Sequence, residues 1–147
     1  MAILKLEQAS KIIDTALAEA RKRNLAPISV AVLDAGGNVI AFKRGDGSGI
    51  VRFDIAYGKA WGALGMGFGT RELATRATNN PAFFNALSAA SKGRMLPSPG
   101  GVLILDAANE VVGAVGVTGD IGDNDELCAI AGIEAVGLKA AGGIPGK

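Results

Sequence analysis

The stretch from Gly113 to Ala135, GAVGVTGDIGDNDELCAIAGIEA, most constrains what this chain can fold into. It begins as an apolar run punctuated by glycines, passes through an acidic turn and ends in a segment rich in small residues. Glycine adopts backbone conformations that other residues resist, and acidic groups in the first turn of a helix complement the helix dipole. The pattern predicts a strand, an acidic loop and a closely packed helix that Asp123 or Asn124 caps.

A related unit lies 72 residues earlier, because Leu33-Asp34-Ala35 recurs as Leu105-Asp106-Ala107 and Gly47 recurs as Gly119. In both places two β-rich runs flank a short turn, which is a hairpin signal, and a loop and a helix follow. The repeat reflects either an old duplication or two independent occurrences of the same local structure. Because each unit alone exposes one face of a sheet, we expect both to share one sheet and one core.

The other elements are expected to be helices. Apolar residues recur at helical spacing over residues 4–24, and Asn24 and Pro27 end that segment. Residues 55–67, IAYGKAWGALGMG, follow Asp54 as a cap and contain many small residues, which favour close packing against another element.

Two shorter helices are expected at residues 71–77, with Thr70 as the cap, and at 82–93, where Asn80 and Pro81 form the start. The core candidates in the second of these helices are Phe83, Phe84 and Leu87. The element order predicts a single α+β domain over residues 1–147, with a mainly antiparallel sheet and packed helices. The tail AAGGIPGK, residues 140–147, is expected to stop a helix and to be mobile.

The composition excludes several classes of function. The net charge is +1, which gives no electrostatic footprint for nucleic acid or a membrane surface. The single cysteine, the lack of a secretory signal and the lack of a long apolar run indicate a cytoplasmic protein. The glycine-rich loop GDGSG, residues 45–49, lacks the lysine spacing of a phosphate-binding loop.

Histidine is absent from the sequence. Catalytic triads, imidazole bases and histidine-ligated metals are therefore excluded. Asp120, Asp123 and Asp125 offer carboxylates to a hard cation, but GDIGDNDE lacks the glycine and the closing glutamate of an EF-hand loop. We expect no metal site.

Four segments together look like the GlcG/HbpS family of haem-binding or haem-degrading domains. They are AVLDAGGNVIAFKRGDG (31–47), DIAYGKAWGALG (54–65), PGGVLI (99–104) and the opening stretch at 113–135. The chain is also similar to the C-terminal domain of PduO-type proteins. The resemblance implies a profilin-like or PAS-like sandwich and a homo-oligomer, with dimers often built into larger rings.

The resemblance also makes haem or another tetrapyrrole the candidate cofactor. Family members that bind haem tend to use a histidine as the iron ligand, and this chain lacks histidine, so the resemblance does not by itself assign a cofactor. Cysteine, methionine and tyrosine also bind haem iron. The candidates here are Cys128, Met66, Met95 and Tyr57, of which Cys128 is expected to be a buried packing residue.

Three functions follow. The first is binding of a small molecule or cofactor near a subunit interface, at a site lined by Arg52, Asp54, Lys59, Pro99, Gly100, Gly101 and Asp123, with Asp125 and Glu126 nearby. The second is an enzyme that acts on a small organic acid or carbonyl compound, with Lys59, Asp125 or Glu126 as the catalytic groups. The third is an accessory subunit whose acidic residues cap helices and pair with lysines across an interface.

Overall fold

A five-stranded antiparallel sheet organises residues 3–145, the part of the chain that the computed structural model describes. Its strands run in the order β2-β1-β4-β3-β5, and all neighbours are antiparallel. Both predicted hairpins are present, which confirms the α+β class. The strands are β1 (Ser29–Asp34), β2 (Val39–Arg44), β3 (Gly101–Leu105), β4 (Val111–Thr118) and β5 (Lys139–Ala141).

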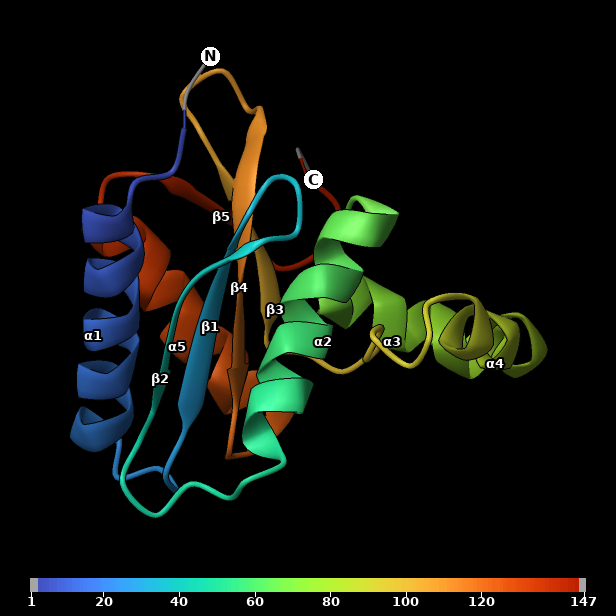
Figure 1. Ribbon diagram of the computed structural model, residues 1–147, viewed down its shortest axis with the longest axis horizontal. Helices are drawn as coiled ribbons and strands as arrows, with labels where there is room; N and C mark the ends of the chain where they lie inside the picture. The colour runs from blue at the N-terminus through green and yellow to red at the C-terminus, as the bar shows by residue number, and fades with distance from the viewer. Residues whose placement is uncertain (1–2, 146–147) are drawn as a thin grey trace.

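Helices cover both faces of this sheet. They are α1 (Leu6–Lys22), α2 (Arg52–Met66), α3 (Thr70–Asn79), α4 (Pro81–Ala90) and α5 (Gly122–Ala135). Figure 1 shows α1 and α5 on one face, α2 on the other, and α3 and α4 projecting away from the sheet. Within residues 3–145, no helix has the length and apolar character that a membrane crossing requires.

The expected single core is wrong, because the sheet separates two. Beneath α1 and α5, branched side chains of the strands, such as Val30 and Val115, pack with Ile12, Ile13 and Ile133 of the two helices. The core beneath α2 is smaller and combines three leucines of the strands with small alanines, namely Leu33, Leu103, Leu105, Ala60, Ala63 and Ala114.

Glycine and alanine allow α2 to lie directly against the sheet. A Cβ atom added at Gly116 of β4 would overlap the carbonyl oxygen of Ala56 in α2. On the other side of α2, a Cβ atom at Gly58 would lie 2.7 Å from the carbonyl oxygen of Arg94. The small residues that predicted close packing of this helix are therefore at backbone contacts.

The repeated unit is confirmed in its local geometry. The carboxylates of Asp34 and Asp106 each accept backbone hydrogen bonds within their turn, at 2.9 Å. Each first strand has a register shift at the equivalent place, between Val32 and Leu33 and between Ile104 and Leu105. The helices that follow, α2 and α5, nevertheless pack on opposite faces of the sheet.

Several helix ends differ from the expectation. Because α2 begins at Arg52, Asp54 lies inside its first turn and does not cap it. Asp123 and Asn124 likewise lie inside α5, whose N-cap is Ile121. The cap of α3 is Gly69. The cap of α4 is confirmed, since the side chain of Asn80 accepts a hydrogen bond from the backbone N–H of Phe83.

Thr70 and the tail have other roles than those expected. The hydroxyl of Thr70 accepts a hydrogen bond from the backbone N–H of Gly101 at 2.7 Å, so it fastens α3 to β3. The prediction that the tail only stops a helix is wrong, because Ala140 and Ala141 pair with Ile104 and Leu103 at the edge of the sheet. Residues 146–147 of the predicted mobile end lie outside the described residues.

Replacing Gly116 with alanine is expected to lower the free energy of unfolding by about 1–3 kcal/mol or more, because the new methyl group must displace α2. The measurement is urea denaturation at equilibrium. The matched control is Gly49→Ala, since a Cβ atom there meets nothing within 4 Å and its φ is not positive. Equal stability of the two variants would contradict the close contact between α2 and β4.

Candidate functional site

A buried ion pair joins α2 to α5 where β4 ends. The Nζ atom of Lys59 donates to the carboxylate of Asp125 at 3.1 Å and to the carbonyl oxygen of Val117 at 2.8 Å. The second carboxylate oxygen of Asp125 accepts the backbone N–H of Asp120 at 3.0 Å. Lys59 is 3% exposed and Asp125 is 1% exposed. Every charged atom of the pair therefore has a partner inside the protein.

Gly100 and Gly101 close over this pair. A Cβ atom at Gly100 would lie 2.8 Å from the Nζ atom of Lys59, and a Cβ atom at Gly101 would overlap the backbone of Lys59. Both glycines are buried. The structure thus brings together four of the predicted site residues, but it encloses them and leaves no room for a ligand between them.

Burial dominates the electrostatics of the pair. It lowers the pKa of Lys59, an effect that the negative charge of Asp125 opposes. It also raises the pKa of Asp125, against the positive charge of Lys59. Desolvation of the two charges thus outweighs their mutual attraction, as is common for buried ion pairs. This geometry favours a role in fastening α2 to α5.

Arg71 of α3 binds two of the predicted acidic residues. Its guanidinium pairs with Asp123 and, at 3.1 Å, with Glu126, both in the first turns of α5. Arg71 is not among the predicted site residues, and no local signal identifies it, because its partners lie 52 and 55 positions away along the chain. The two carboxylates are therefore already paired within the chain.

Of the remaining predicted residues, two lie in the first turn of α2 and the third lies beside the start of α5. Arg52 is partly buried and donates to the hydroxyl of Thr118 at 2.8 Å. Asp54 is exposed on the surface of α2. Pro99 packs against Gly122 at the start of α5. Arg52 and Asp54 are thus accessible to a ligand, whereas Lys59, Gly100 and Gly101 are not.

The three loop aspartates do not converge. Asp120 accepts hydrogen bonds from the backbone of Ala26 and from the side chain of Asn124, while Asp123 and Asp125 pair with arginine and lysine. Among residues 3–145, no group of three or more acidic or cysteine side chains is arranged to hold a metal ion.

An open hollow of about 300 Å³ lies between the end of α2 and the helices α3 and α4. We call it the α4 hollow, and its lining is Met66, Arg76, Asn79, Asn80, Phe83 and Phe84. The prediction that the two phenylalanines and Leu87 belong to the core is wrong, because no residue of α4 is buried. One signal in the sequence was missed. The helix α4 has no charged residue, so its sequence does not distinguish a solvent-facing side from a core-facing side.

The candidate iron ligands lie in different surroundings. Cys128 is fully buried, and burial raises the pKa of its thiol to about 11, so it remains a neutral packing residue. Tyr57 is partly buried and stacks against Phe53. Met66 lines the α4 hollow, and Met95 lines a second hollow, of about 290 Å³, on the other side of α4.

The variant Asp125→Asn is expected to lose about 3–5 kcal/mol of stability at pH 7, because Lys59 stays buried without its counter-charge. Burial lowers the folded pKa of Lys59, and without the opposing charge of Asp125 this pKa falls further in the variant than in the wild type. The stability of the variant therefore rises more with pH, up to the ordinary pKa of lysine. The deficit should therefore shrink between pH 7 and pH 10, as thermal denaturation would measure.

The control is the double variant Lys59→Met/Asp125→Leu, which removes both charges and should recover most of the loss at pH 7. If the double variant is as unstable as Asp125→Asn, the unpaired charge of Lys59 is not the cause of the loss, and the structural role of the ion pair is contradicted.

Comparison with known proteins gives a consistent family. A model of HbpS-like proteins, described as haem degrading, matches residues 4–134. A 15.0 kDa protein of Citrobacter freundii is 31% identical over 129 residues, which are 88% of this chain and 89% of that protein.

Solved structures agree with this match. A double mutant of HbpS from Streptomyces reticuli is 34% identical, with a TM-score of 0.78 over 92% of this chain and 88% of that one. A PduOC structure in complex with haem, 23% identical, shares the fold with a TM-score of 0.84 over 93% of this chain and 97% of that one. The family model matches most of this chain, so the chain belongs to the HbpS-like family.

Proposed function

We propose that this protein binds haem or a related tetrapyrrole in the α4 hollow, near a subunit interface. The observation that carries the proposal is the lining of this hollow, where a thioether, two phenyl rings and a guanidinium surround one space of about 300 Å³. Its family, described as haem degrading, supports a haem-related ligand. The haem complex of PduOC supports the same ligand class for this fold.

The chemistry of the lining fits a tetrapyrrole. The sulfur of Met66 is a ligand type that haem iron accepts, and it would hold the iron in place of the histidine that this chain lacks. Phe83 and Phe84 offer apolar rings to a flat macrocycle. When bound, haem would supply redox and oxygen chemistry, while the chain would bind and orient it.

Arg76 is the group that would pair with a carboxylate of the ligand. Its guanidinium lies 4.2 Å from the ring centroid of Phe68, and its Nε atom donates to Glu72 at 3.3 Å. The Arg76–Glu72 pair is partly exposed and spans one helical turn. Such a pair contributes little stability, so Arg76 is free to bind a second carboxylate at low cost.

The accessible residues of the sequence-predicted site provide the competing location. Arg52 and Asp54, at the start of α2, would orient a polar ligand there. The enzyme hypothesis requires Lys59, Asp125 or Glu126 to reach a substrate, and the first two are enclosed. Binding in the α4 hollow requires no such opening of the structure, which is why we prefer it.

Titration of the purified protein with haem should give a saturable Soret band. Met66→Leu should shift that band and weaken binding by roughly tenfold or more, which corresponds to about 1.4 kcal/mol, because the iron loses its ligand. Arg76→Gln should weaken binding without shifting the band. Absorption spectroscopy and Kd values from the titration provide both readouts.

Met95→Leu and Arg52→Gln are the matched controls, since they change the same residue types outside the α4 hollow. If Arg52→Gln weakens binding and Met66→Leu does not, the site belongs at the start of α2. If haem does not bind to the wild-type protein at all, the proposed function is wrong.

A further inference from the structure

An open hollow of about 240 Å³ lies at the end of α1. We call it the α1 hollow. Three segments form its wall, namely the last turns of α1, the loop between α1 and β1, and the turn that follows β2. Figure 1 shows these segments together at the lower end of the molecule, away from α3 and α4. The α1 hollow therefore shares no wall with the α4 hollow.

Hydrogen bonds fix the wall of the α1 hollow. The backbone N–H of Gly45, after β2, donates to the carbonyl oxygen of Ile28 at 2.9 Å. The backbone N–H of Ala26 donates to a carboxylate oxygen of Asp120 at 2.9 Å, which fastens the loop after α1 to the segment before α5. The hollow is thus formed before any ligand binds, as is usual for small-molecule sites.

The floor of the α1 hollow is aliphatic. Ala20 is 5% exposed and Ile28 is 2% exposed, and the other apolar side chains of the lining are Leu17, Leu25 and Pro27. An aliphatic group placed on this floor would be removed from water, which is favourable. No aromatic ring belongs to the lining. The volume is also below the roughly 300–1,000 Å³ of pockets for drug-sized ligands, so the ligand that fits is small and aliphatic.

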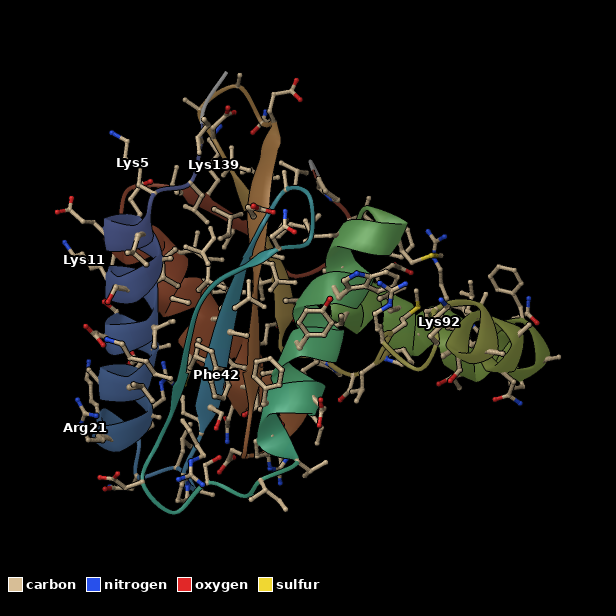
Figure 2. All side chains as sticks on the ribbon, in the orientation of Figure 1. Lys5, Lys11, Arg21, Phe42, Lys92 and Lys139 are labelled. Atoms are coloured by element: carbon tan, nitrogen blue, oxygen red, sulfur yellow. The ribbon has the colours of Figure 1, made fainter. Side chains whose placement is uncertain are left out.

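The rim of the α1 hollow carries one charge of each sign. Arg21, in the last turn of α1, and Asp46, in the turn after β2, both belong to the lining and both are exposed. Figure 2 shows Arg21 at the lower end of α1. Among the described residues neither side chain forms an ion pair, whereas nearby Arg23 is paired with Glu19 at 3.3 Å. Both rim charges are therefore available to a ligand.

We propose that the α1 hollow binds a free amino acid with a branched aliphatic side chain, for which leucine is the model. The side chain lies on the aliphatic floor, Arg21 pairs with the carboxylate, and Asp46 pairs with the ammonium group. The partial negative charge at the C-terminal end of α1 also favours the ammonium group. A simple carboxylic acid or amine would leave one rim charge without a partner, so a zwitterion is the ligand class that uses the whole lining.

Titration calorimetry of the wild-type protein with leucine and two analogues tests the ligand class. The analogue 4-methylpentanoate lacks the ammonium group, and 3-methylbutylamine lacks the carboxylate. Each should bind roughly tenfold more weakly than leucine or worse, because each loses a hydrogen bond between charged groups. Glycine should also bind more weakly, because it places no side chain on the floor. If leucine does not bind, or if either analogue binds as tightly as leucine, the proposal is wrong.

Substitutions at the rim test the location. Arg21→Gln and Asp46→Ser should each raise the Kd for leucine roughly tenfold with unchanged circular dichroism, since both positions are exposed and serine suits a turn. The matched controls are Lys22→Gln and Glu110→Gln, which remove the same kinds of charge at exposed positions outside the α1 hollow. Equal Kd values for the rim variants and their controls would overturn the proposal. All titrations use protein without haem, so a failure of haem binding leaves this test intact.

Discussion

Backbone contact between α2 and β4 is the constraint on which the other features depend. Gly116 admits the carbonyl group of Ala56, and this contact places the next turn of α2 over the end of the strand. Lys59 then reaches Val117 and Asp125 inside the protein, and the opposite side of α2 accepts the loop before β3 at Gly58. The same placement brings Met66, the last residue of α2, to the α4 hollow. Lys92, which follows α4, lies on the part of the molecule that projects from the sheet (Figure 2).

The sequence predicted the local structure well because local rules generate it. The recurrence of Leu33-Asp34 as Leu105-Asp106 marks two hairpins that share a turn and a register shift. Periodicity located the helices within a few residues, and the antiparallel sheet followed from the hairpins. The predicted caps at Asp54 and Thr70 are wrong, because the same side chains also suit other positions. Asp54 lies inside the first turn of α2, and the hydroxyl of Thr70 binds the backbone of β3.

The candidate site was predicted only in part, since it depends on contacts between distant segments. Lys59 and Asp125 do meet, but their burial follows from the packing of α2 and α5 at one end of β4. Arg71 binds Asp123 and Glu126 because α3 lies near the start of α5, and no sequence motif predicts that proximity. The sequence predicted that Phe83 and Phe84 belong to the core, because large apolar side chains are usually buried. Hydrophobicity does not show which element would bury them, and in the structure no element does.

The two edges of the sheet are poor templates for the addition of another strand. On one side the edge strand β5 has only three residues, and on the other β2 ends in Lys43 and Arg44. Short edges and exposed cations resist the addition of a foreign strand. Growth of the sheet from molecule to molecule, the route by which many β-rich proteins aggregate, is therefore blocked at both ends. A contact between two molecules would then use helices or loops and would not extend the sheet.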